Sequence, residues 1–178
     1  MQWDIAVELG ALEGAMGVSM PMEQIASGIV RCLERVPDDV PAGLHLCYGD
    51  YGHQHWKQPE SLQMQVDLVN AVISATRLDF VSFTVPQDRD DSAYFEPLSG
   101  LQTGADTELN FAVVPYYPAD QAPGTTERQV ERIDAALAAS VGGTREWGIC
   151  TECGMGRVDG RDVPALLDLH SEILRASR

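Results

Sequence analysis

Basic residues are scarce in this sequence. It has 12 Lys and Arg against 27 Asp and Glu among its 178 residues, which gives a formal net charge of -15. Such a surface repels the phosphates of nucleic acid and of anionic lipid, and the sequence has no basic stripe to offset that repulsion. We therefore exclude nucleic-acid binding.

Long apolar runs are also missing. No run approaches the ~18 apolar residues of a transmembrane helix, and the opening MQWDIAVELGALEG has neither the basic nor the apolar region of a signal peptide. We expect no membrane partner and a cytoplasmic location. Because 44% of the residues are hydrophobic, the chain can bury a substantial core, and we expect residues 1–178 to form one domain.

Cysteine is sparse, with four residues in the chain. This number does not indicate a disulfide framework, and the second Cys-x-x-Cys pair of a structural zinc ribbon is missing. Cys32 lies in a helical pattern and is interpreted as a small buried hydrophobe. Cys150 and Cys153 also allow a redox interpretation, although redox pairs usually open a helix and this pair follows an apolar strand pattern.

Strand and helix patterns alternate along the whole chain. The predicted strands are QWDIAVEL, LHLCY, FVSFTV, ELNFAVVPYY and EWGICTEC, and the long predicted helices are residues 21–36, 59–76, 124–140 and 163–177. Right-handed crossovers turn this order into an α/β fold with a parallel sheet. The carboxyl ends of its strands, where such sheets keep their sites, then carry Asp4, His45, Cys47 and Cys153.

The segment HLCYGD places two metal-binding side chains on one strand. Because side chains alternate along a strand, His45 and Cys47 point to the same face. Imidazole and thiolate suit zinc, which keeps one position open in catalytic sites. A His-x-Cys pair often occurs by chance, so the zinc hypothesis depends on Cys153 as a third ligand.

The segments MQWD, HLCYGD and CGMGR resemble, in this order, the C-terminal barrel of cobalamin-independent methionine synthase. Its superfamily includes corrinoid-dependent methyltransferases and uroporphyrinogen decarboxylase, and the DRDD and TECG patterns are typical of an uncharacterised branch. The resemblance implies a (β/α)8 TIM-barrel-like fold of which this chain has the fourth to eighth strands. It also implies a zinc ion on His45, Cys47 and Cys153 that activates a substrate thiol for methyl transfer. Asp4 would bind the amino group of a homocysteine-like substrate or, alternatively, cap a turn.

Two features depart from this family. Thr84 ends the third predicted strand, where the zinc shell of the family usually has a glutamate, and a threonine hydroxyl is a poor zinc ligand. A carboxylate could take the place of the missing glutamate, and the candidates are Asp88, Asp90, Asp91 and Glu152. Alternatively, a three-ligand site with water could suffice, or the metal is weakly bound or absent. A complete barrel also needs about 250 residues, so we expect a second chain or an N-terminal segment to complete the sheet.

The remaining candidates follow the predicted strand ends. Arg89 would clamp a substrate carboxylate or belong to a solvated charge run. His53 and His55 would belong to a loop over the site or to a solvated turn, and Tyr116 would line the pocket or pack against the rim.

The expected function is that of a zinc-dependent methyltransferase-like enzyme, with a small-molecule thiol and a methyl donor as its partners. Two alternatives remain. One is a decarboxylase-type or other reaction of the same superfamily, for which the cysteines are unnecessary. The other is a catalytically silent barrel fragment that acts by association.

Overall fold

The computed structural model describes residues 1–49 and 54–176, apart from the side chains of Met16 and Arg157. The strands are β1 (Gln2–Ile5), β2 (Gly43–Leu46), β3 (Phe80–Phe83), β4 (Glu108–Phe111) and β5 (Gly148–Ile149). The α-helices are α1 (Ala6–Leu12), α2 (Met22–Leu33), α3 (Gln63–Ile73), α4 (Ser92–Phe95), α5 (Thr125–Leu137) and α6 (Val163–Ala176). Four short 3₁₀ turns are η1 (Ala15–Gly17), η2 (Glu96–Gly100), η3 (Pro118–Asp120) and η4 (Met155–Arg157).

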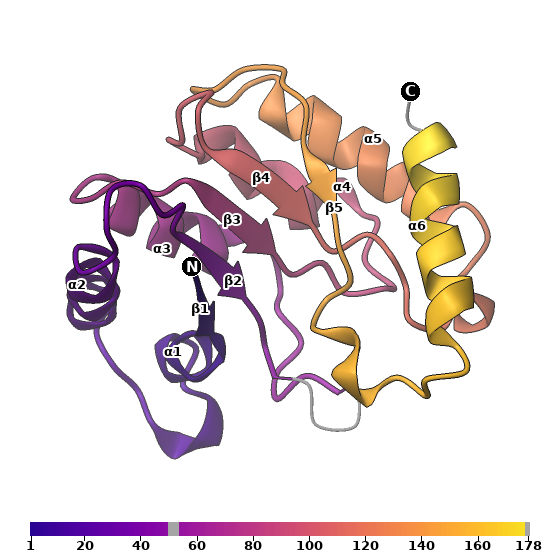
Figure 1. Ribbon diagram of the computed structural model, residues 1–178, viewed down its shortest axis with the longest axis horizontal. Helices are drawn as coiled ribbons and strands as arrows, with labels where there is room; N and C mark the ends of the chain where they lie inside the picture. Colours follow the sequence, from indigo (N-terminus) through magenta and orange to yellow (C-terminus); the bar gives the residue numbers. More distant parts are fainter. Residues whose placement is uncertain (50–53, 177–178) are drawn as a thin grey trace.

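The five strands form one parallel sheet in the order β1-β2-β3-β4-β5, so each strand pairs with its neighbours in the chain (Figure 1). A parallel pair needs a crossover, and the intervening helices supply it. This sequential order is that of a TIM barrel, in which each strand follows its predecessor around the ring. The expected α/β class and partial TIM-barrel-like fold are therefore confirmed.

The sheet has one apolar and one polar face. The apolar face packs in one core with α2, α3 and α5, and its fully buried residues are Leu44, Leu46, Val81, Phe83, Leu109 and Phe111. On the other face the register aligns Asp4 with His45, His45 with Ser82, and Ser82 with Asn110. This polar row lies on the face that lines the interior of a closed barrel.

Several strands are shorter than the sequence pattern predicts. The predicted strand QWDIAVEL ends at Ile5, and its last residues begin α1. These residues turn into a helix because Ala, Glu and Leu favour helices and because the ladder with β2 ends at the Ile5–Leu46 pair. The prediction for EWGICTEC was also too long, since β5 is only Gly148–Ile149.

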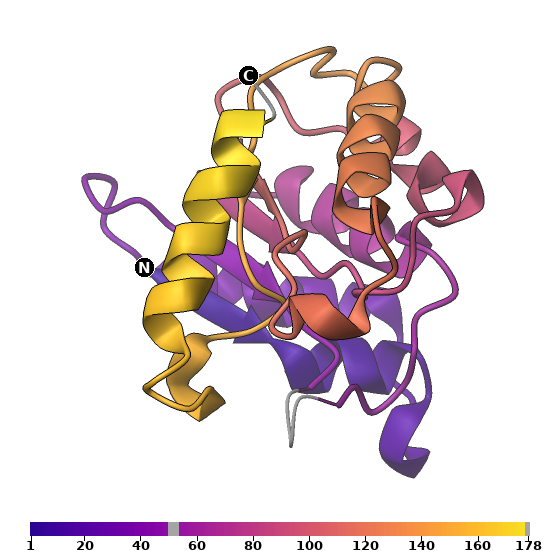
Figure 2. The ribbon, with the colours of Figure 1, turned by 90° about the vertical axis from the view of Figure 1, so that its right-hand side faces the viewer.

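Helix α6 lies at the β5 end of the sheet, near α5 (Figures 1 and 2). Its Leu166 joins Val114 and Tyr116 in a small second core, against which Ile149 of β5 also packs. Helix α6 therefore supports the chain segments that leave β4 and β5. Among the described helices, none is both long and apolar enough to cross a membrane.

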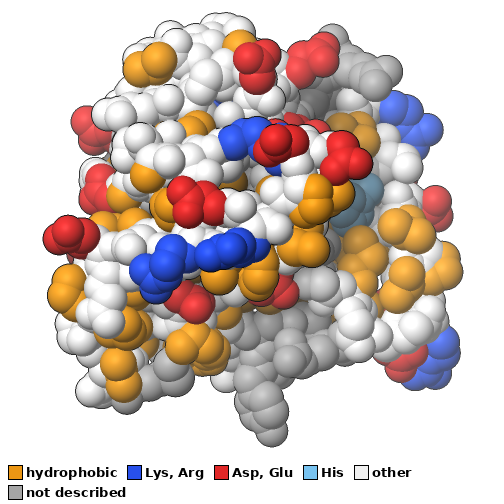
Figure 3. Space-filling view, turned by 60° about the vertical axis from the view of Figure 1, so that its left-hand side comes forward, with side chains coloured by type: hydrophobic (Ala, Val, Ile, Leu, Met, Phe, Trp, Pro, Cys, Tyr) orange, Lys and Arg blue, Asp and Glu red, His pale blue; other side chains and the backbone are white. Residues whose placement is uncertain are grey.

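The other end of the sheet, β1, is an open edge. The Gly43 N–H donates to the Met1 carbonyl, so the backbone groups of Gln2 and Asp4 point away from β2. Beside this edge, a groove of about 640 Å³ lies between α1 and α2, and the exposed Val7 lines it. Figure 3 brings the α2 side forward and shows apolar side chains exposed among charged ones.

Candidate metal centre

Two candidate ligands come from the carboxyl end of β2. His45 lies on the polar face of the strand and is half-buried, whereas Cys47 follows the last strand residue and is almost fully buried. The ligand atoms of the two side chains lie within 4.8 Å of each other, as side-chain alternation along a strand predicts. The His-x-Cys spacing therefore delivers an imidazole and a thiol to one place.

The third candidate ligand, Cys153, comes from the loop after β5. Its Sγ lies 2.8 Å from Cys47 Sγ and 3.8 Å from His45 Nε2. The ligand atoms of the three residues all lie within 4.8 Å of one another, and the group is one that could hold a metal ion. No disulfide joins any of the four cysteines.

The donor set fits zinc. One imidazole and two thiolates are the nitrogen and sulfur ligands that zinc prefers, and three protein ligands leave a fourth position for a substrate. Zn–S bonds of about 2.3 Å place two tetrahedral sulfur ligands about 3.8 Å apart. The sulfurs of Cys47 and Cys153 are closer than this, so they would separate by about 1 Å to hold the ion.

Thr84 does not join this group, because its polar atoms all bond β2 or the helices α3 and α4. It is fully buried, and its hydroxyl donates to the Leu46 carbonyl at 2.5 Å. Its N–H and carbonyl bond the side-chain amide of Gln65, and its carbonyl also accepts from the Tyr94 hydroxyl. Position 84 thus ties β3 to β2 and supplies no fourth ligand.

Three of the four candidate carboxylates have other partners. Glu152 pairs with His55 at 3.3 Å, Asp90 with Arg128 at 2.7 Å, and Asp91 with Arg89 at 2.9 Å. Burial alone would lower the pKa of His55, but its hydrogen bond to Glu152 and the charge of that carboxylate outweigh burial and raise the pKa. The His55–Glu152 pair therefore fixes the loop after β2 against the Cys153 loop.

Cys150 is near the group but is a different kind of thiol. Burial raises its pKa to about 12, and the charges of Cys153 and Glu152 act in the same direction. A thiol with such a pKa stays protonated at neutral pH and is a poor nucleophile. Cys150 is therefore a weaker candidate for thiolate chemistry than the two cysteines of the group that could hold a metal ion.

A cavity of about 770 Å³ opens over the three candidate ligands. Asp4 and Ser82 line it from the polar face of the sheet, and Trp56 lines it from the loop after β2. Gly49, at φ +91°, carries the chain past the indole of Trp56, where a Cβ would overlap the ring. The predicted substrate residue Asp4 is therefore in the same cavity as the candidate ligands.

Arg89, the other predicted substrate residue, does not line this cavity. Its guanidinium donates to the Glu60 carbonyl at 2.9 Å and lies 4.7 Å from the ring centroid of Tyr94. These contacts join the loop after β3 to the segment before α3. We therefore leave Arg89 out of the site, and the predicted histidine His53 lies outside the described residues.

Tyr116 has a role that sequence reasoning missed. The pattern indicated a pocket-lining or packing aromatic, but its hydroxyl accepts a hydrogen bond from the Cys153 N–H at 3.0 Å. The same hydroxyl donates to the Cys153 carbonyl. No signal in the sequence could have found this contact, because it joins two loops of irregular backbone.

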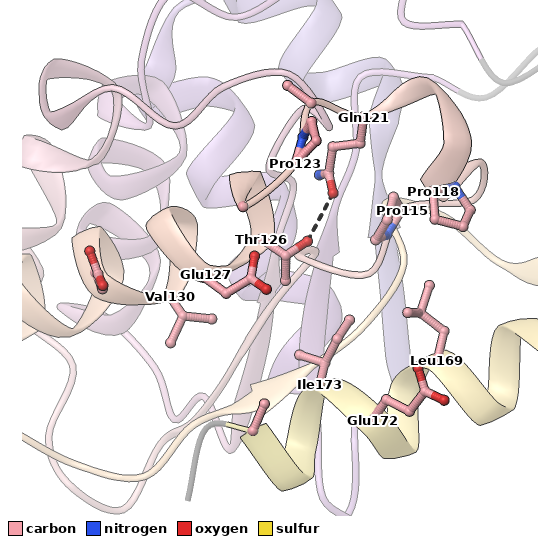
Figure 4. A pocket seen from close by; sticks show the side chains of 14 residues that line it. Pro115, Pro118, Gln121, Pro123, Thr126, Glu127, Val130, Leu169, Glu172 and Ile173 are labelled. Carbon is pink, nitrogen blue, oxygen red and sulfur yellow. Dashed lines mark hydrogen bonds between the residues drawn. The ribbon is translucent and has the colours of Figure 1, made fainter.

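A second groove of about 620 Å³ lies between α5 and α6 (Figure 4). Its labelled residues include three prolines, Leu169 and Ile173, with Glu127 and Glu172 from the two helices. Within the described residues it contains no Cys or His. Its lining residues are those of a depression on the surface between two helices. Its volume alone therefore does not make it an alternative candidate for the functional site.

Comparisons with known proteins support the fold. No family model matches the sequence, and no curated protein matches it. One solved structure that is similar is that of a Listeria monocytogenes protein provisionally assigned as a vitamin-B12-independent methionine synthase, with a TM-score of 0.58 and 11% identity. The match covers 99% of this chain and 46% of that protein, so this chain spans just under half of its length. At this identity the comparison shows a distant relationship in fold alone.

Proposed function

We propose that this chain carries the metal-binding part of a zinc-dependent methyltransferase that acts on a small thiol. One observation carries the proposal: His45, Cys47 and Cys153 converge within 4.8 Å of one another in a cavity at the carboxyl end of a parallel sheet. That end is where enzymes with this architecture keep their sites. The fold of the Listeria protein is the same in outline, which supports the choice of chemistry.

In this proposal His45, Cys47 and Cys153 would hold the ion, and the substrate thiol would bind beside them in the cavity. Bound zinc supplies Lewis acidity, which lowers the pKa of a bound thiol toward neutral pH. Cys47 is buried, and Trp56 lines the cavity beside it. Both residues therefore form part of the wall of the cavity that would receive the substrate thiol.

Asp4 binds the cationic group of the substrate in this proposal. It is exposed on the polar face and opposite His45 in the register, and its carboxylate accepts from Gln2 Nε2 at 2.8 Å. In the transfer, the thiol proton leaves to solvent, a sulfur–carbon bond forms to the methyl group, and the bond between that methyl group and its donor breaks. Residues 1–178 would act as the C-terminal part of a barrel in which a further strand pairs with β1.

Isothermal titration calorimetry of zinc-loaded protein tests the thiol-binding step without knowledge of the methyl donor. Homocysteine titrated in two buffers of different ionisation enthalpy should release about one proton per thiol bound at pH 7, because a thiol with a pKa near 8.5 binds as thiolate. Homoserine, which has a hydroxyl in place of the thiol, should not bind. Thiol binding without proton release, or equal binding of homoserine, would contradict the proposal. Cys32→Ser, which changes a cysteine outside the candidate ligand group, should bind homocysteine as the wild type does.

A further inference from the structure

The loop that carries Cys153 is fixed by two side chains. Cys153 lies between β5, which ends at Ile149, and η4, which begins at Met155. The Tyr116 hydroxyl accepts from the Cys153 N–H at 3.0 Å and donates to its carbonyl. Thr151 Oγ1 donates to the same carbonyl at 2.6 Å. Both backbone polar groups of Cys153 are therefore held by side chains and not by a helix or strand ladder.

Tyr116 is itself firmly anchored. Only 7% of its surface is exposed, and it belongs to the small core that it forms with Val114 and Leu166 of α6. Its position after β4 is fixed because the Val114 N–H donates to the Cys150 carbonyl. The ring thus connects α6 and the β4–β5 pair to the backbone of one candidate ligand.

We propose that Tyr116 is the positioning residue that holds Cys153 Sγ beside Cys47 and His45. The inference rests on the proposed metal centre and extends it to a residue outside the ligand set. Cys153 has the least secondary structure around it of the three ligands, so its side-chain position depends most on such contacts. Groups that orient ligands from outside typically contribute 10- to 100-fold in metal affinity.

A purely structural role is the competing explanation, and Tyr94 provides the matched control. Its buried hydroxyl donates to the Thr84 carbonyl at 3.2 Å. Tyr94→Phe therefore removes the same atom from a buried tyrosine without touching Cys153. If the hydroxyl of Tyr116 served stability alone, Tyr116→Phe and Tyr94→Phe would behave alike in every assay.

The first test measures Zn²⁺ affinity by competition with a chromophoric chelator, together with the thiolate-to-metal absorbance of the Cd²⁺ form. We expect Tyr116→Phe to lower Zn²⁺ affinity by about 10- to 100-fold and to reduce the absorbance, and Tyr94→Phe to keep wild-type values. Equal affinities in the two variants would overturn the inference and leave the proposed function intact. A wild-type protein that binds neither ion would contradict the proposed function.

The second test needs no metal. Diamide oxidises two neighbouring thiols to a disulfide and is itself reduced to the hydrazine, so the rate of Cys47–Cys153 cross-linking reports how often the two sulfurs are adjacent. We expect slower cross-linking in metal-free Tyr116→Phe than in Tyr94→Phe or wild type, measured by peptide mass spectrometry. The same rate in all three proteins would overturn the positioning role even if no metal binds.

Discussion

At the scale of single residues, the candidate metal site depends on which side chains lie close to Cys47. The sequence was sufficient to predict that His45 and Cys47 share a face, because strand alternation is a local rule. Cys153 is 106 positions from Cys47, and it was indicated by its place after the last predicted strand together with the family pattern. The contact between Tyr116 and Cys153 could not be predicted, since hydropathy reports that a tyrosine is buried and not where its hydroxyl points.

Thr84 gives a prediction at this scale. In Thr84→Val the Leu46 carbonyl loses its hydroxyl donor while the shape is kept, so the free energy of unfolding should fall by about 1–2 kcal/mol. Because Thr84 is outside the ligand group, the zinc content should not change. Urea unfolding and elemental analysis measure the two effects. Loss of zinc with full stability would show that position 84 contributes to the metal site after all.

At the scale of elements, the apolar pattern located the five strands and the four long helices, but it misplaced the strand ends and missed α1. Helix α3 lies inside the predicted residues 59–76, and β4 lies inside ELNFAVVPYY. Val113 and Val114 are buried although they follow β4. Apolar patterns report burial, whereas a strand also requires ladder hydrogen bonds, and this difference explains why the predicted strands were too long.

The short helix α4 provides a test by pH. Asp91 caps it by accepting from the Tyr94 N–H, and it pairs with Arg89. Burial alone would raise the pKa of Asp91, but its bonds to Arg89 and to the Tyr94 N–H outweigh burial and lower it. A carboxyl with a lowered folded pKa stabilises the protein above its unfolded pKa, and this stability is lost as pH falls through the folded pKa.

We therefore expect Asp91→Ala to lower the free energy of unfolding by about 1 kcal/mol at pH 7, as for other lost N-caps. Asp91→Asn keeps a capping oxygen and should cost less. The deficit of Asp91→Asn should shrink as pH falls below the unfolded pKa of 3.8. Urea titrations at several pH values measure it, and a deficit that stays constant with pH would contradict a role for the charge.

At the scale of the whole molecule, the sheet has the strand order of a barrel, but among the described residues its end strands β1 and β5 do not pair with each other. One edge is β1, whose outward backbone groups lie beside an apolar groove. Trp3, which lines this groove, has a buried indole N–H without a partner among the described residues. Open edges and apolar grooves favour association. This feature follows from the strand count, which the sequence predicted.

Val7 tests the open edge. It is 60% exposed in the groove beside β1, so Val7→Lys should weaken self-association by adding charge to an apolar surface. Sedimentation velocity over a range of concentrations should show wild-type protein associating at lower concentration than the variant. Val141→Lys, at a more exposed valine outside this groove, should match wild type. Monomeric wild-type protein throughout, or equal effects of both variants, would contradict association through β1.

The central claim is that His45, Cys47 and Cys153 form one metal site, and zinc content tests it most directly. Elemental analysis should find about one zinc per chain in wild type and in Cys32→Ser, as expected for a single three-ligand site. Cys47→Ser and Cys153→Ser should both lose the metal. Wild-type protein without zinc after reconstitution under reducing conditions, or full zinc content in both variants, would contradict the account.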